Sequence, residues 1–222
     1  MQKVERPKTL KEHALESLRD AITSNSLKPG TRLIERNLCE TMGVSRTVVR
    51  ECIRHLESEH LVVGIPNSGF AVASISDDEV KEVYEIRTLL ECMAVRECSK
   101  VITADIIQSL YRLHDQIAGH LEKDDIKTAL SLTKDFYKLI FQSAGKHVAW
   151  VLVEQLNSRI SRLRAMTLSS EGRKTAGPKD LYEMVRALEK HDADKACAIC
   201  ERHLKEAYEI ACRLEKDTTH EK

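Results

Sequence analysis

Residues 34–57 have the sequence IERNLCETMGVSRTVVRECIRHLE. Apolar residues at helical spacing predict one helix over about 34–41 and a second over 45–57. Gly43 lies in the short segment between them, where glycine readily adopts the left-handed backbone conformation of a tight turn. We therefore predict a helix-turn-helix over residues 34–57.

The segments on either side of this motif complete a winged domain. Residues 9–24 (TLKEHALESLRDAITS) have the apolar spacing of a first helix. Residues 61–73 (LVVGIPNSGFAVA) contain two β-rich runs around a Pro-Asn-Ser-Gly turn, which predicts a hairpin. Three helices followed by a hairpin are the order of a winged helix-turn-helix, whose third helix enters the DNA major groove. We predict this domain over residues 1–75, with its wing at 61–73.

The remaining chain, residues 76–222, is predicted to be all-helical. The run Ser76-Asp77-Asp78-Glu79 is a capping-box pattern that starts a long helix. Further helices are predicted at 103–121, 124–143, 147–168, 179–190 and 192–214. Ser169 to Pro178 is polar and is predicted to be a connecting loop. The expected fold class is mainly α, with a winged helix-turn-helix followed by a bundle of about six helices.

Composition and charge narrow the possible classes of protein. A chain of 222 residues with 42% hydrophobic and 32% charged residues suits a soluble folded protein. No stretch approaches the roughly eighteen apolar residues of a membrane helix, and no secretory signal is evident, so we expect a cytoplasmic protein without a membrane partner. The formal net charge is zero, with 11 Lys and Arg against 9 Asp and Glu up to Ser74. DNA binding must therefore depend on where particular arginines lie.

The start of the third helix has the composition of a DNA-reading surface. Arg46 and Arg50 are four residues apart and project from one face, and Ser45 and Thr47 add hydroxyl groups. Arginine binds the guanine edge through two hydrogen bonds, and hydroxyl groups bind phosphates or base edges. Arg36, at the start of the second helix, is placed to bind a phosphate near that helix's positive end. The alternative is a solvated face whose arginines only pair with nearby acids, and the preceding helix, glycine turn and hairpin count against it.

A family resemblance rests on these same residues. The run LKPGTRLIERNLCETMGVSRTVVRECIRHLESEHLV at 27–62, with PNSGFAV at 66–72, resembles the DNA-binding domain of GntR-family bacterial regulators over residues 9–74. The resemblance implies double-stranded operator DNA as a partner. The positions implied to contact it are Arg36, Ser45, Arg46, Thr47, Arg50, Asn67, Ser68 and Gly69.

The second half is similar to the FCD effector domain of the FadR subfamily, in its shorter VanR-like version. Its anchors are VYEIRTLLE at 83–91, FQSAGKH at 141–147 and DADKACAICERHL at 192–204. The resemblance implies a homodimer and a small-molecule effector, often a carboxylic acid held through a metal that one Asp and three His bind. In this chain the four corresponding positions are Thr133, Tyr137, Leu181 and His203.

Only one of those four ligand types is present, so we expect no metal and no other cofactor. One imidazole beside a hydroxyl and a phenol does not make a useful divalent-metal site. Asp135 and Asp180 would substitute if the register were shifted by a residue or two. A metal-free polar cavity is predicted between Thr133, Tyr137 and His203. A carboxylate bound there needs a cationic partner. The alternative is that each candidate arginine forms only a surface or interhelical salt bridge. The candidates are Arg87, Arg159 and Arg162.

The combined expectation is a non-enzymatic transcriptional regulator controlled by a small metabolite, with repression favoured by the resemblance. One alternative is a constitutive DNA-binding dimer whose bundle is purely structural. Another is a helical enzyme fused to a DNA-binding module, with Tyr137 and His203 as acid and base. The enzyme is disfavoured because the sequence shows no nucleophile motif, no cofactor fingerprint and no orienting carboxylate at an evident spacing from His203.

Overall fold

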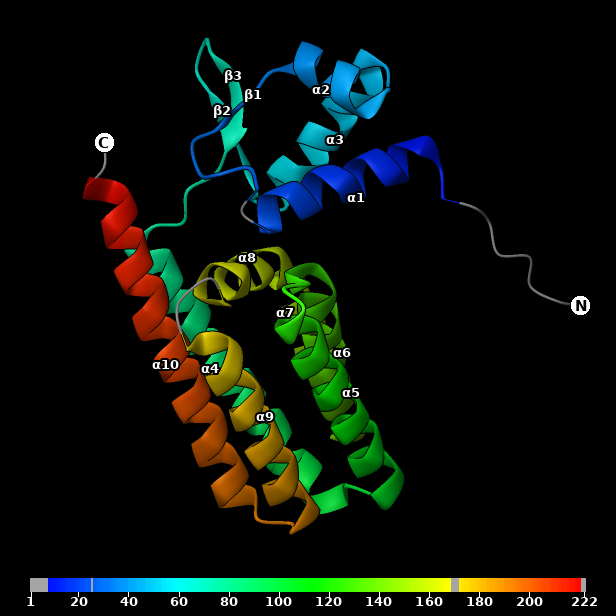
Figure 1. Cartoon of the computed structure of the whole chain (residues 1–222), viewed down its shortest axis with the longest axis vertical. Helices are drawn as coiled ribbons and strands as arrows, with labels where there is room; N and C mark the ends of the chain where they lie inside the picture. The colour runs from blue at the N-terminus through cyan, green and yellow to red at the C-terminus, as the bar shows by residue number, and fades with distance from the viewer. Residues whose placement is uncertain (1–7, 25, 169–171, 221–222) are drawn as a thin grey trace, which may run out of the picture. The chain divides into compact units, whose positions relative to one another are not determined.

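The structure, a computed structural model, describes residues 8–24, 26–168 and 172–220, with side chains described up to residue 214 (Figure 1). The chain divides into two compact units, Met1–Ser74 and Ile75–Lys222, each with its own hydrophobic core. Residues 169–171 of the predicted connecting loop, and residues 1–7 of the predicted first domain, lie outside the described residues. None of the described helices has the length and apolar character needed to cross a bilayer.

The first unit is the predicted winged helix-turn-helix. Its elements are α1 (Leu10–Thr23), β1 (Arg32–Leu33), α2 (Glu35–Met42), α3 (Arg46–Ser58), β2 (Val62–Ile65) and β3 (Gly69–Val72). The described strands form one antiparallel sheet in the order β1-β3-β2, in which Arg32 pairs with Ala71 and Val63 pairs with the same residue from the other side. Strand β1 was not predicted, because a two-residue strand shows no periodicity and depends on its pairing with β3.

Local signals explain where the helices of this unit begin and end. Thr9 caps α1 in a reciprocal capping box with Glu12. Gly43 ends α2 with a φ of 64°, the left-handed conformation predicted for the turn. Val49 and Ile53 of α3 are fully buried in the core. Because these two residues face inward, the opposite face at the start of α3 faces solvent.

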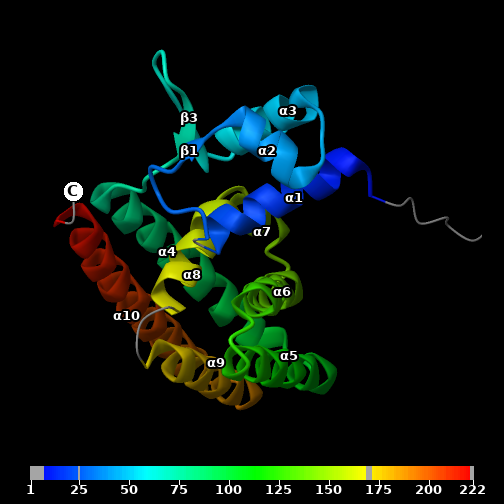
Figure 2. The same cartoon turned by 45° about the horizontal axis from the view of Figure 1, so that its top comes forward.

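The second unit is the predicted helical bundle. Its helices are α4 (Asp77–Val101), α5 (Ala104–Glu122), α6 (Ile126–Ser143), α7 (His147–Gln155), α8 (Asn157–Leu168), α9 (Arg173–Glu189) and α10 (Ala193–His220). Both cartoons show α10 running alongside α4 and α9, and α5 alongside α6 (Figures 1 and 2). Ser76 starts α4 by accepting a hydrogen bond from the N–H of Glu79, which is half of the predicted capping box.

Two predicted helix boundaries in this unit are wrong. The single helix over 147–168 is two helices, α7 and α8, which gives seven described helices instead of six. At Leu156 the N–H bonds to the carbonyl of Val153, a tighter pattern that ends α7 while the apolar pattern continues. The predicted loop runs too far, because α9 already begins at Arg173. Gly177 and Pro178 are buried inside α9, and this burial outweighs their poor helix propensity.

Candidate functional site

The N-terminal end of α3 exposes the polar side chains that the sequence predicted for it. The Ser45 hydroxyl caps the helix by accepting a hydrogen bond from the N–H of Val48 at 3.4 Å. Thr47 is exposed, and the side chains of Arg46 and Arg50 are 70% and 54% exposed. These groups lie on a helix anchored by its opposite, buried face. They therefore form a solvent-facing set of hydrogen-bonding groups on an anchored helix.

Glu35, the first residue of α2, holds both arginines. The Nε of Arg46 donates to Glu35 Oε2 at 2.5 Å, and the Nε of Arg50 donates to both carboxylate oxygens at 3.0 and 3.1 Å. These hydrogen bonds lower the pKa of Glu35 below its ordinary value. Since the contacts use Nε, the Nη groups of each guanidinium remain for a nucleic acid. Sequence reasoning missed Glu35, because only the folded turn brings it to Arg46 and Arg50.

The other predicted DNA contacts are also exposed. Arg36 lies in the first turn of α2, with its Nε 3.9 Å from Glu40 Oε1. The wing turn exposes Asn67, Ser68 and Gly69. Asn67 and Gly69 have φ values of 58° and 83°, a left-handed conformation that suits a tight hairpin tip. All eight predicted positions are thus accessible in the first unit.

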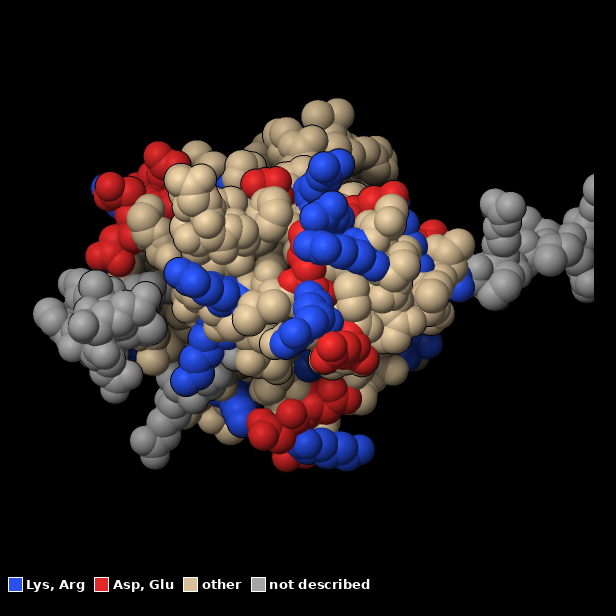
Figure 3. All heavy atoms as spheres, turned by 90° about the horizontal axis from the view of Figure 1, so that it is seen from above, with Lys and Arg blue, Asp and Glu red and all other residues tan. Residues whose placement is uncertain are grey.

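Surface charge is mixed rather than uniformly basic. On the face that Figure 3 draws, Lys and Arg side chains are interspersed with Asp and Glu side chains. This pattern agrees with the formal net charge of zero. Recognition of DNA by this chain therefore requires specific arginines more than a general positive field.

A cavity of about 50 Å³ lies within the helical unit. Its polar lining residues come from α4, α6, α8, α9 and α10, and apolar side chains such as Leu130 and Leu181 line the rest. The polar residues of the lining are Arg87, Thr133, Arg164, Thr167, Arg173 and His203. The cavity is thus rich in guanidinium groups and contains no carboxylate in its lining.

Three of the six predicted pocket residues do not line this cavity. Tyr137 is buried beside it, with its ring 5.0 Å from the guanidinium carbon of Arg164. Arg159 pairs with Glu79 at 2.5 Å, and Arg162 is buried outside the lining. Arg159 and Arg162 belong to α8, a helix separate from α7, whereas Tyr137 belongs to α6. Arg87, Thr133 and His203 do line the cavity, as predicted.

Two arginines that were not predicted as ligand-binding residues, Arg164 and Arg173, line the cavity. Arg164 shares Glu91 with Arg87: the distances from Glu91 Oε1 are 2.8 Å to Arg87 Nε and 3.9 Å to Arg164 Nη2. Burial, followed by the charge of Arg87, lowers the pKa of Arg164. Sequence reasoning placed Arg173 in a loop, so no helical pattern pointed to it.

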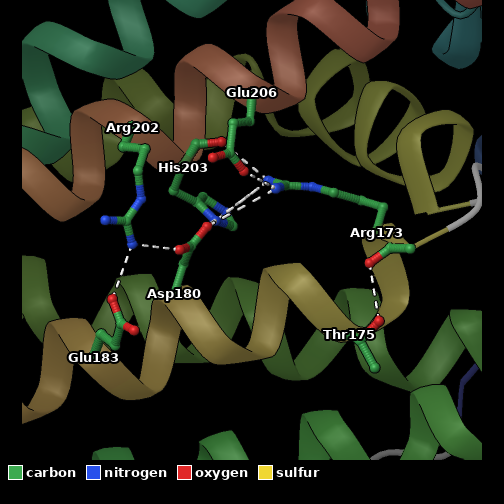
Figure 4. A network of polar contacts seen from close by, with 8 residues as sticks. Arg173, Thr175, Asp180, Glu183, Arg202, His203 and Glu206 are labelled. Carbon is green, nitrogen blue, oxygen red and sulfur yellow. Dashed lines mark hydrogen bonds and ion pairs between the residues drawn. The ribbon is translucent and has the colours of Figure 1, made fainter.

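A polar network surrounds His203 (Figure 4). Its Nδ1 lies 3.1 Å from Asp180 Oδ2, and Arg202 Nη2 donates to Asp180 Oδ1 at 2.7 Å. Arg173 Nη1 donates to Glu206 at 3.3 Å, and its Nη2 donates to the His203 carbonyl at 3.0 Å. Burial lowers the pKa of His203, which favours the neutral imidazole.

The residues present do not fit the metal that this kind of domain often holds. Asp180, one residue before the expected Leu181, is the carboxylate that faces His203. Its two oxygens are already engaged by Arg202 and His203, and the Arg173 guanidinium lies 3.9 Å away. Within the described residues, no group of three or more His, Cys, Asp and Glu side chains is arranged to hold a metal ion.

Comparisons with known protein families give one match in each of the two units. The family described as "Bacterial regulatory proteins, gntR family" matches residues 10–72, and the "FCD domain" family matches residues 82–206. The chain is 27% identical over 203 residues to the HTH-type transcriptional repressor RspR of Escherichia coli K12, covering 91% of this chain and 89% of RspR. It is 30% identical over 139 residues to the HTH-type transcriptional regulator McbR of the same strain, covering 63% of each chain.

Solved structures share the fold. E. coli McbR/YncC superposes with a TM-score of 0.75 at 22% identity, covering 93% of this chain and 99% of that one. A putative GntR regulator from Rhodococcus sp. RHA1 also gives a TM-score of 0.75, at 20% identity and 91% and 97% coverage.

An exposed helix-turn-helix in one unit and an arginine-lined cavity in the other, together with these matches, define a two-domain, DNA-binding transcriptional regulator, which is a non-enzymatic class. The chain belongs to the GntR family of bacterial regulatory proteins, and its helical unit is an FCD domain.

Proposed function

We propose that this chain is a cytoplasmic, homodimeric repressor whose operator affinity is controlled by a small organic acid bound, without a metal, in the helical unit. The observation that carries the DNA-binding part is the pair of exposed arginines aligned by Glu35 at the start of α3. Each arginine can bind a guanine edge through two hydrogen bonds. Repression is supported by the name of RspR, a transcriptional repressor to which this chain is similar along most of its length.

Exposed apolar side chains on the helical unit support the dimer. On α4, Ile86, Leu89 and Met93 follow one another at helical spacing and are solvent-accessible, and Leu89 is 72% exposed. On α7, Val148 is 78% exposed and Val151 lies on the same accessible side of the helix. Exposed apolar side chains grouped at helical spacing are typical of a protein interface. Two copies would present two winged units to a pseudo-palindromic operator.

The guanidinium-rich cavity supports control by an acid. Arg87 and Arg164 lie where a carboxylate would meet two planar donors, and Thr133 adds a hydroxyl group. In this proposal the bound acid shifts the population between arrangements of the dimer that differ in operator affinity. A bundle with a purely structural role is the competing possibility, and it predicts that no organic acid changes the melting temperature.

Selection of DNA sites from a random pool tests the DNA-binding part. We expect the wild-type protein to enrich a short inverted repeat. The Arg46→Ala and Arg50→Ala variants should lose that preference, since each removes one base-reading group. Arg112→Ala is the matched control, because it removes one exposed arginine from the helical unit. Enrichment of the same sites at unchanged affinity by both α3 variants would show that α3 does not read the groove.

A further inference from the structure

Two arginines that line the cavity share one carboxylate. The side chains of Arg87 and Glu91 are 2% and 1% exposed, and that of Arg164 is 14% exposed. Of the described residues, Glu91 is the acid that lies within 4.0 Å of either guanidinium. Among the residues that the structure describes, Arg87 is one whose buried Nη1 has no hydrogen-bond partner. An unpartnered donor therefore belongs to a residue that lines the cavity.

This cluster carries one uncompensated positive charge. Two guanidinium groups and one carboxylate leave a net charge of about +1, because arginine keeps its proton in proteins. The rings of Tyr84 and Tyr137 lie 5.1 and 5.0 Å from Arg87 and Arg164, respectively, and stabilise the cations in part. Burying an unpaired charge costs free energy that an aromatic face offsets only partly. An anion in the cavity would remove that cost.

The neighbouring network does not provide this anion. Arg173 has its own acids, with Glu206 at 3.3 Å and Asp180 at 3.9 Å. Burial lowers the pKa of His203, which favours the neutral imidazole. The excess charge thus stays with Arg87 and Arg164.

We propose that the Arg87–Arg164 pair takes the place of the metal cation and binds the carboxylate of a small monoanion directly. The net charge favours a monocarboxylate over a dicarboxylate. A cavity of about 50 Å³ has room for about four water-sized groups, which corresponds to an acid of about two or three carbon atoms. Leu130, Leu181 and Pro178 line the remainder and suit a short aliphatic chain. This inference rests on the proposed control by an organic acid and specifies its chemistry.

Calorimetric titration of the full chain, treated with a chelator, tests the proposal. The probes are acetate, propionate and butyrate, with malonate and succinate as dianions and propionamide as a neutral analogue. We expect a monocarboxylate to bind, the dianions to bind more weakly and the amide not to bind. Arg164→Gln removes the excess charge and should weaken monocarboxylate binding about 10- to 100-fold. Arg159→Gln is the matched control on α8, because Arg159 lies outside the cavity lining, and it should bind like the wild type.

Charge variants separate an electrostatic role from a packing role. Glu91→Gln raises the net charge and should favour the dianions. The double variant Glu91→Gln with Arg164→Gln returns the net charge to that of the wild type and should recover monocarboxylate binding. The proposal is overturned if the double variant folds but binds no monocarboxylate, or if binding requires added Zn²⁺. It is also overturned if Arg164→Gln binds like the wild type. Preferred binding of the dianions by the wild-type protein would overturn the monoanion inference and leave control by an organic acid standing. If none of the acids binds, the monoanion inference and the proposed control by an organic acid both fail. Operator binding is tested independently, by the selection of DNA sites.

Discussion

The carboxylate of Glu35 accepts a hydrogen bond from Nε of Arg46 at 2.5 Å, so the first residue of α2 is tied to the first residue of α3. The same carboxylate accepts from Arg50 at 3.0 Å. One acid therefore orients both proposed base-reading side chains before DNA arrives. It also offsets part of their positive charge, which reduces attraction to phosphates at any sequence.

Glu35→Gln should reduce the discrimination between operator and unrelated DNA. Without the carboxylate, the two arginines lose their common anchor and gain net positive charge. We expect affinity for unrelated duplex to rise and the specificity ratio to fall about tenfold, within the range of one arginine–guanine contact. Fluorescence anisotropy at several salt concentrations measures both affinities. Glu40→Gln, an exposed acid on the same helix, is the control, and an unchanged ratio in Glu35→Gln would contradict the anchoring role.

Arg36→Ala should weaken binding to all DNA sequences alike. In the proposed role, Arg36 contacts a phosphate, which carries no sequence information. We expect the slope of log affinity against log salt to become smaller by about one, with the specificity ratio preserved. Arg54→Ala removes an exposed arginine farther along α3 and serves as the comparison. A change in the selected operator sequence caused by Arg36→Ala would instead assign this residue to base reading.

Acidification should destabilise the helical unit through His203. Burial lowers the pKa of His203 below its ordinary value of 6.5, so the unfolded chain binds a proton more readily than the folded one. The contribution of the neutral imidazole to the free energy of unfolding is therefore fully present when the pH is above that ordinary value, and it is lost as the pH falls below it. Urea unfolding between about pH 7.5 and about pH 5.5 should show this loss. His203→Gln should flatten the dependence, whereas a change at the exposed His13 should leave it intact. A His203→Gln profile that parallels the wild type would exclude this cause.

Leu89→Glu should separate the proposed dimer. A charge on the exposed stripe of α4 is readily hydrated in a monomer but costly in an apolar interface. We expect light scattering after gel filtration to give the monomer mass, and operator affinity to fall because the two half-sites are no longer bound together. Leu10→Glu introduces the same charge at an exposed leucine of the first unit and is the control. If Leu89→Glu elutes as a dimer, a different surface joins the copies.

Local sequence signals determined the winged unit. Ser45 as a cap, Gly43 as a left-handed turn and the apolar spacing of α3 depend on residues close together in the chain, so they could be predicted without a tertiary structure. The same signals predicted a mainly helical second half. They failed at α7 and α8, where a break at Leu156 interrupts an apolar pattern that continues past it.

Which charged side chains meet depends on how the helices pack. Glu35 reaches Arg46 and Arg50 because the turn folds α2 against α3, and no spacing along the chain marks that contact. Arg164 lines the cavity and Arg159 does not, because the rotation of α8 is set by packing against its neighbours. Helical periodicity indicates which face of a helix is apolar, whereas the position of a cavity depends on how several helices pack together. For this chain, local sequence patterns were enough to predict the DNA-binding fold, whereas the packing of the bundle sets which charges line its cavity.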